Sequence, residues 1–269
     1  MICFFGKLPW YFNYFVHTCK FNPTLDFFII TDDRSWSGVL PQNVIIIHKE
    51  MEDLNRLASE KLGFKTRINE GYKLCDFKPA YGFLFPEIIE GYNFWGHGDI
   101  DVVYGDIRHF ITDEVLDNHE LISVRHDFLT GYFLLFKNTH KMNTLFMQSM
   151  DYKKVYSSDI HYCFDETNFQ FREFSDIGIY PEVEHEVESM MHLVDRLKKE
   201  DKLKTYFDFH VIEGIPGRLK WKKGKLFYKN QYEILLYHMI LFKNVCDPRD
   251  IPELIPDCFT ISPTRICCC

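Results

Sequence analysis

The sequence predicts an α/β domain in which a mostly parallel sheet is flanked by helices. Short apolar runs typical of buried strands recur along the first 140 residues, and segments with helical spacing of apolar residues separate them. Strands that alternate with helices indicate βαβ units and a parallel sheet. The hydrophobic fraction of 46% in 269 residues supplies enough core for one large domain.

The elements of the first half follow from local patterns. Apolar runs at residues 2–5, 26–31 and 44–48 predict strands, because glycine or acidic residues bound the first two and β-branched residues fill the third. Residues 9–20 and 50–62 have the apolar spacing of helices. The next predicted elements are a helix over 72–90 kinked at its prolines, a strand over 92–95, a short helix over 107–111, and strands over 120–124 and 131–136.

The pattern is less regular beyond about residue 150. Residues 182–200 predict a charged helix with a packing stripe of methionine and leucine. Residues 221–228 predict a hairpin with a glycine turn, and their lysines are expected on a solvated sheet edge that blocks further pairing. Because no repeat or linker interrupts the chain, we expect a single domain over residues 1–269.

Charge and cysteine content restrict the class of protein. The net charge of −8 argues against nucleic acid as the main partner, so an anionic ligand would need a metal ion or a local cationic pocket. No window approaches the roughly 20 apolar residues of a membrane span, although peripheral membrane contact stays open. Nine cysteines without a C-x-x-C motif or signal peptide predict reduced thiols and a cytoplasmic location. The triplet at 267–269 is expected to be a frayed tail rather than an acylation or redox site.

The most informative segment is 95–106, in which Asp99 and Asp101 follow an apolar run. Side chains at i and i+2 of an extended segment face the same way, so both carboxylates can reach one ion. Gly96 and Gly98 are expected to let the backbone turn tightly as it leaves the strand. Oxygen ligands suit Mg²⁺ or Mn²⁺, which commonly bind a substrate phosphate as well. The segment predicts a divalent-metal diphosphate site, with a turn-capping or solvated acid pair as the alternative.

Two further segments are predicted to end at the same edge of the sheet. Gly6 follows the first predicted strand, Asp32 follows the second, and Asp99 follows the strand that carries the acid pair. Ligands of open α/β sheets bind at the carboxyl ends of the strands. We therefore expect these three positions to converge on one site.

The order of these segments resembles nucleotide-sugar glycosyltransferases of the GT-A fold, closest to bacterial and viral polysaccharide-type transferases. The resemblance rests on residues 30–33 (ITDD), 73–80 (KLCDFKPA) and 94–101 (FWGHGDID), and it is good over about residues 1–140. It implies a Rossmann-type sheet, a nucleotide-sugar-binding half over residues 1–140, and an acceptor-side half over residues 141–269.

The resemblance implies a metal centre. Asp99 and Asp101 would hold the ion, and His238, in an apolar segment near the C-terminus, would be the third ligand. A nitrogen ligand beside two carboxylates favours Mn²⁺ over Mg²⁺. The alternative for His238 is an ordinary core histidine.

The resemblance also implies a donor site for a nucleotide-sugar, preferably a UDP-sugar. Asp76 and Lys78 would orient the sugar, although the family often places arginine where this chain has Pro79, so the cationic role passes to Lys78 or is lost. The residues expected to line the nucleotide are Phe4, Phe5 and Gly6, with Asp32 and Asp99 as hydrogen-bond partners of the base or ribose.

The predicted reaction is transfer of the sugar to a hydroxyl of a glycan or other acceptor. Asp165 and Glu166 are the candidate catalytic acids, with Asp159 as a competitor and a helix N-terminal acid pair as the non-catalytic alternative. In an inverting reaction one of them would deprotonate the acceptor, and in a retaining reaction they would position the sugar. The alternative functions are a metal-dependent phosphoesterase and a non-catalytic carbohydrate-binding protein on a degenerate transferase fold.

Overall fold

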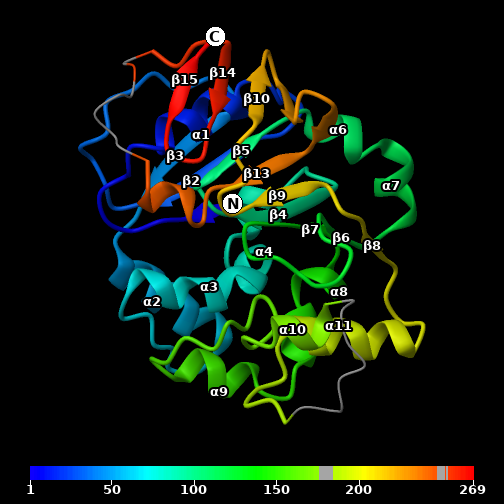
Figure 1. Ribbon diagram of the computed structural model, residues 1–269. Helices are drawn as coiled ribbons and strands as arrows, with labels where there is room; N and C mark the ends of the chain where they lie inside the picture. Colours follow the sequence, from blue (N-terminus) through cyan, green and yellow to red (C-terminus); the bar gives the residue numbers. More distant parts are fainter. Residues whose placement is uncertain (176–183, 247–251, 253) are drawn as a thin grey trace.

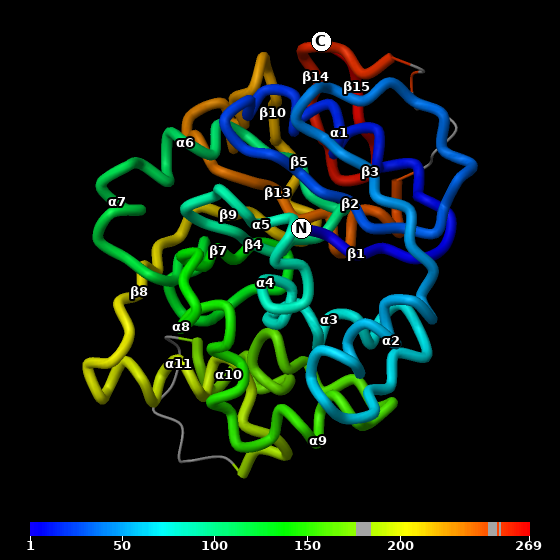
Figure 2. Tube along the Cα trace, turned by 180° about the vertical axis from the view of Figure 1, so that it is seen from behind, coloured from blue at the N-terminus to red at the C-terminus, as the bar shows by residue number. Residues whose placement is uncertain are grey.

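The computed structural model describes residues 1–175, 184–246, 252 and 254–269, and it has a mixed α/β architecture. Strands cross the middle of the molecule, most helices lie on one side of them, and α1 (Phe12–Cys19) lies on the other with the C-terminal strands (Figure 1, Figure 2). Within these residues, every helix is too short or too polar to cross a bilayer.

The first sheet is parallel, as predicted. It has the order β1 (Ile2–Cys3), β2 (Phe27–Thr31) and β3 (Val44–His48). Helix α1 makes the crossover from β1 to β2, which two parallel neighbours require. Helix α2 (Met51–Leu62) follows β3 and ends at Gly63, whose φ of 75° suits a left-handed cap.

The other sheets are not mostly parallel, so that prediction is wrong beyond β3. One sheet has the order β4 (Phe94–Gly98), β7 (Phe133–Lys137), β6 (Leu121–Ser123) and β8 (Thr205–Phe207), and its only parallel pair is β6 with β8. Another places β13 (Leu236–His238) antiparallel to β5 (Val102–Tyr104) and parallel to β9 (Val211–Glu213). Strands β6 and β7 pair antiparallel because the loop between them is too short for a crossover.

Residues 71–89 form a series of short helices instead of the predicted kinked helix. Pro79 and Pro86 lack the N–H that a continuous helix needs, and Pro86 begins the last of these helices. The series is η1 (Gly71–Lys73), α3 (Leu74–Phe77), η2 (Lys78–Ala80), α4 (Tyr81–Leu84) and α5 (Pro86–Ile89).

The remaining helices are α6 (Ile107–Phe110), α7 (Asp113–Asn118), α8 (His140–Asn143), η3 (Leu145–Gln148), α9 (Tyr152–Ser157), α10 (Phe171–Phe174), α11 (Met190–Lys199) and η4 (Phe242–Asn244). The predicted helix over 182–200 begins only at Met190, where Ser189 and His192 form a capping box. Residues 182 and 183 lie outside the described residues.

The predicted hairpin is β10 (Leu219–Lys222) with β11 (Lys225–Tyr228), in an antiparallel sheet that continues with β12 (Tyr232–Ile234), β14 (Cys258–Ile261) and β15 (Ile266–Cys268). The prediction that its lysines mark a sheet edge is wrong, because β10 is central and Lys222 and Lys225 are exposed beside the turn. The last cysteines are not a frayed tail, because β15 pairs with β14. None of the nine cysteines forms a disulfide.

Two layers of core lie on opposite faces of β4 and β7. Trp95, Leu134 and Phe136 pack against α4, α8 and α11 on the helical side. Phe94 and Phe133 face the other way, toward α1 and β5. The alternation follows from the period of two along a strand. It fixes the register of β4, and therefore the place at which the loop with Asp99 and Asp101 leaves the sheet.

Candidate metal centre

Gly96 and Gly98 do not turn the backbone as predicted, because β4 continues through both of them. Neither has a left-handed φ. Their role is close approach instead. A Cβ at Gly96 would lie 2.5 Å from the carbonyl oxygen of Leu134, and one at Gly98 would lie 2.9 Å from that of Tyr132. The strand therefore stays paired up to the loop that carries the two aspartates.

Asp99, Asp101 and His238 come together at the end of β4. The two aspartates lie in the short loop between β4 and β5, and β13 pairs with β5 so that His238 is opposite Val102. One ligand atom from each of the three lies within 4.8 Å of the others. Asp101 and His238 are buried, whereas the Asp99 side chain is 33% exposed. Two carboxylates and an imidazole that converge in this way can hold one divalent cation.

His238 contacts one predicted residue, Asp101, and one residue that was not predicted, Glu213. Its Nε2 lies 3.5 Å from Asp101 Oδ2, and its Nδ1 lies 3.4 Å from Glu213 Oε1. Arg125 donates to Glu213 at 2.5 Å and to Asp127 at 2.7 Å. A carboxylate on the second nitrogen of a ligating histidine fixes its orientation. No local pattern marks Glu213, because only the pairing of β9 with β13 brings it to His238.

The carboxylates control the protonation of His238. Burial alone would lower its pKa, but the hydrogen bonds of Asp101 and Glu213 and the negative charges of Asp101 and Asp99 outweigh burial and raise the pKa to about 9. The pKa of Asp101 is lowered, because His238 and Lys243 outweigh the cost of burying its charge. The metal-free centre therefore holds a protonated imidazole at neutral pH.

Two lysines hold the predicted metal ligands. Lys78 Nζ lies 2.7 Å from Asp99 Oδ1, and Lys243 Nζ lies 2.7 Å from Asp101 Oδ2. Lys78 was among the predicted site residues, whereas Lys243 was not. Lys243 follows β13 in η4, five residues after His238, and its side chain is 30% exposed. The centre thus has a cation on each carboxylate.

Asp165 and Glu166 lie on the other side of Lys78. Asp165 Oδ2 is 3.6 Å from Lys78 Nζ, and Glu166 Oε1 accepts a hydrogen bond from the Gly131 amide at 2.5 Å. Burial raises the pKa of both carboxyl groups. Asp165 is 2% exposed, whereas Glu166 is half-buried, so Glu166 is the more accessible acid of the pair. The pair does not begin a helix, since α10 starts at Phe171.

Gly131 lets this cluster close. Its carbonyl oxygen accepts a hydrogen bond from Lys78 at 3.0 Å. A Cβ at Gly131 would lie 2.6 Å from Asp165 Oδ2 and 3.0 Å from Lys78 Nζ. Any larger residue at position 131 would therefore separate Lys78 from the acids. The spacing of residues in the sequence does not reveal this role of Gly131.

Asp76 does not face the open part of the site, contrary to its predicted contact with a donor sugar. Its side chain is fully buried and accepts hydrogen bonds from Lys73 Nζ at 2.8 Å and from the Phe164 amide at 2.8 Å. The Tyr162 amide donates to it as well, at 3.0 Å. This placement favours a structural role, in which Asp76 holds the turn that leads into Asp165.

The carboxyl ends of β1 and β2 lie next to each other, whereas the predicted convergence of Gly6 and Asp32 with Asp99 stays a prediction. The Gly6 amide donates to Asp32 Oδ1 at 2.7 Å, so one oxygen of the predicted ribose or base contact is already used. Phe4 and Phe5 are half-buried and pack into different cores.

Tyr11, at the N-terminal cap of α1, was not among the predicted site residues. Burial and then the charges of Asp101 and Asp99 raise its pKa, so its hydroxyl lies within range of charge interaction with both aspartates. Asp159, the alternative candidate for the catalytic acid, is exposed, and its Oδ2 lies 3.9 Å from Arg67 Nη1.

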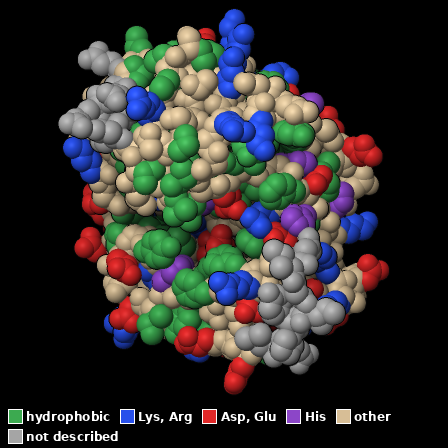
Figure 3. Space-filling model, in the orientation of Figure 1, with side chains coloured by type: hydrophobic (Ala, Val, Ile, Leu, Met, Phe, Trp, Pro, Cys, Tyr) green, Lys and Arg blue, Asp and Glu red, His purple; other side chains and the backbone are tan. Residues whose placement is uncertain are grey.

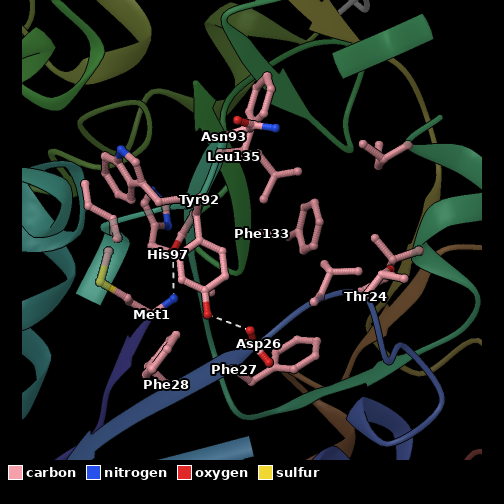
Figure 4. Close-up of a pocket in the computed structure, with 18 of the residues that line it drawn as sticks. Met1, Thr24, Asp26, Phe27, Phe28, Tyr92, Asn93, His97, Phe133 and Leu135 are labelled. Carbon is pink, nitrogen blue, oxygen red and sulfur yellow. Dashed lines mark hydrogen bonds between the residues drawn. The ribbon is translucent and has the colours of Figure 1, made fainter. Parts of the chain in front are cut away.

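The face that Figure 3 shows is hollowed across its middle, with acidic side chains on the floor and hydrophobic side chains on both edges. A separate cavity of about 430 Å³ lies along β2 and the start of β4, and none of the metal-centre residues lines it. In Figure 4, Phe27, Phe133 and Leu135 line this cavity, and the Tyr92 hydroxyl donates to Asp26 at 2.5 Å. Because this cavity is apolar, the acid cluster is the better candidate for chemistry.

The first prediction concerns Asp76. Replacing it with asparagine leaves the buried ammonium of Lys73 without a counter-charge, so we expect the free energy of unfolding to fall by about 3–5 kcal/mol. Urea denaturation measures this change. Asp53→Asn, which removes an exposed ion pair with Arg56, is the matched control and should cost less than about 1 kcal/mol. A stable Asp76→Asn protein that selectively loses nucleotide-sugar binding would contradict the structural role and support the predicted contact of Asp76 with the sugar.

The second prediction follows from the pKa of His238. Because the folded pKa is above the unfolded value of about 6.5, the stabilisation is fully present below pH 6.5 and is lost as pH rises through about 9. The difference of about 2.5 pKa units corresponds to at most about 3.4 kcal/mol. In EDTA, wild-type protein should therefore lose more stability between pH 6.5 and 9.5 than His238→Gln. Parallel urea-stability curves for the two proteins would contradict the charged pair.

Comparison with known proteins adds one relationship. No curated protein and no solved structure matches this chain. A family model described as a family of unknown function (DUF6625) matches residues 1–268, which is nearly the whole length. The chain therefore belongs to the family of unknown function DUF6625.

Proposed function

We propose that the protein is a metal-dependent glycosyltransferase of GT-A-like, Rossmann-type architecture that uses a nucleotide-sugar, preferably a UDP-sugar. The observation that carries the proposal is the convergence of Asp99, Asp101 and His238 beside a second acid pair. Cys3, at the end of β1, lies within range of charge interaction with Lys78, and a nucleotide would bind at the carboxyl ends of the strands in a sheet of this kind. The acceptor would be a hydroxyl group of a glycan or another molecule.

The residues present fit a divalent ion. Two carboxylates and one imidazole suit Mn²⁺, or Mg²⁺ with less preference, and leave positions for phosphate oxygens. When bound, the ion would stabilise the negative charge that develops on the leaving diphosphate. Lys78 and Lys243 flank the two carboxylates and would bind phosphate oxygens from either side.

Glu166 is the residue that would act on the acceptor. Its raised pKa makes it a better base than an ordinary glutamate, and its partial exposure lets a hydroxyl group reach it. In an inverting reaction its carboxylate accepts the proton of the attacking hydroxyl. In a retaining reaction the same group orients the donor sugar. Asp165, buried beneath it, keeps Lys78 in place.

The geometry gives less support to a phosphoesterase. Enzymes of that class commonly hold two ions, about 3.5–4 Å apart, between many acids and histidines. Among the residues that the structure describes, Asp99, Asp101 and His238 form the one group of three that could hold a metal. A single centre with a separate acid pair fits glycosyl transfer better.

The third prediction is that UDP binds only with a divalent metal. Calorimetry should show binding of UDP with Mn²⁺ and none with EDTA, because without the ion Lys78 and Lys243 stay paired with Asp99 and Asp101 and are not free to bind phosphate. Asp101→Asn should weaken the Mn²⁺-dependent binding by at least roughly tenfold, since it removes a buried ligand. Asp117→Asn, an exposed aspartate on α7, is the matched control and should bind normally. Equal UDP affinity with Mn²⁺ and with EDTA would refute the metal site.

The fourth prediction tests Glu166. Glu166→Gln should lower sugar transfer, or hydrolysis of the nucleotide-sugar, by a factor on the order of 10²–10⁴, the range typical of general bases. Its affinity for UDP with Mn²⁺ should change little, because Glu166 does not contact the predicted metal ligands. Glu87→Gln, at an exposed glutamate of α5, should leave both quantities unchanged. Turnover of Glu166→Gln equal to wild type would remove this residue from the mechanism.

A further inference from the structure

Three aromatic rings form a row beside the acid pair. Tyr72 and Phe169 are 68% and 58% exposed, which is unusual for large rings. His161 lies between them, with its ring centre 4.7 Å from that of Tyr72 and 5.4 Å from that of Phe169, and both contacts are edge-to-face. This ring row, Tyr72–His161–Phe169, therefore offers ring surface to the solvent at both ends.

The ring row adjoins the proposed catalytic acids. Phe169 belongs to the same turn as Glu166 and lies three residues after it. Burial raises the pKa of Tyr72, and the charges of Asp165 and Glu166 contribute to the shift, so the two acids lie within range of charge interaction with its hydroxyl. His161 is anchored by its contact with the buried Asp76, at 3.2 Å. A molecule that lies on the rings would therefore reach Glu166.

The backbone holds Phe169 in this exposed position at a cost. Its φ is +64°, a left-handed conformation that is rare for a bulky residue and costs on the order of 1–3 kcal/mol. Asn168, with a φ of +54°, fixes the turn by donating to the Tyr162 carbonyl at 2.9 Å and accepting from the Glu186 amide at 3.0 Å. The turn thus presents an apolar ring to water when the fold could have buried it.

We propose that the ring row is the acceptor subsite and that it binds an oligosaccharide. The proposal rests on the proposed glycosyltransferase function and names its acceptor class. One face of a pyranose ring presents C–H groups that pack on an aromatic face, while its hydroxyl groups stay at the edges. A single nucleobase would cover one ring, whereas successive sugar rings match a row. The acceptor hydroxyl would then meet Glu166.

Charge selects the kind of glycan. Asp165 and Glu166 lie within range of charge interaction with Tyr72 of the ring row. Asp99 lies beyond them on the far side of Lys78, and the chain as a whole is acidic. A glycan rich in uronic or sialic acids would be repelled by these carboxylates. The expected acceptor is therefore a neutral or amino-sugar oligosaccharide.

The test uses an array of immobilised neutral, amino-sugar and acidic oligosaccharides, followed by affinity measurements on the neutral and amino-sugar glycans that bind. We expect Tyr72→Ala and Phe169→Ala to weaken binding by at least roughly tenfold, whereas Tyr72→Phe retains it. Phe169→Ala keeps a Cβ on the same backbone, so the strain of the turn is unchanged. Tyr232→Ala, at a tyrosine of β12 that is 56% exposed, is the matched control and should bind as wild type does.

The same proteins are titrated with UDP and Mn²⁺. Unchanged UDP affinity in Tyr72→Ala, with weakened glycan binding, supports the acceptor subsite. Weakened UDP affinity with normal glycan binding would show that Tyr72 stacks on a base, and would overturn the proposal. A wild-type protein that binds none of the neutral or amino-sugar glycans would overturn it too. Glycan binding that needs the rings in a protein without Mn²⁺-dependent UDP affinity would refute only the proposed transferase function.

Discussion

The candidate site depends on the buried ammonium group of Lys78. It joins three segments that are far apart in the chain, through Asp99 after β4, Asp165 in the turn before α10, and the carbonyl group of Gly131 before β7. Burial opposes its charge, but the carboxylates around it, Asp99 first, raise its pKa well above the usual value. Without this charge, the carboxylates of Asp99 and Asp165 would repel each other where little water can reach them, and the two side chains would move apart.

Local patterns in the sequence predicted the elements whose formation is local. The strand over 44–48 has the predicted bounds, and the helix over 50–62 begins one residue later than predicted, because apolar spacing alone defines them. The antiparallel pairing beyond β3 could not be predicted in this way, since partners depend on connections and packing across the whole chain. The D-x-D pair was visible for the same reason as the strands, because both acids lie in one short segment.

The parts of the site that the sequence did not reveal are those that long-range pairing creates. Glu213 and Lys243 reach the centre only because β13 lies between β5 and β9. Asp76 is a different case. The sequence placed it near the site, but it could not show that the side chain points into the protein interior and away from the open part of the site. Along residues 73–78 the side chains diverge: Asp76, paired with Lys73, accepts from the amides of residues 162 and 164, while Lys78 enters the acid cluster. Short helices separated by prolines do not keep the simple helical faces that the prediction assumed.

The pairing of lysines with the metal ligands has a consequence for binding. Asp99 and Asp101 each hold one ammonium group, so the metal-free centre is already neutralised and does not attract a cation strongly. A dication that displaced both ammonium groups would leave them free beside it. Phosphate oxygens are the partners that two lysines and a dication would share. On the proposed function, this arrangement would favour joint binding of metal and diphosphate over binding of either one alone.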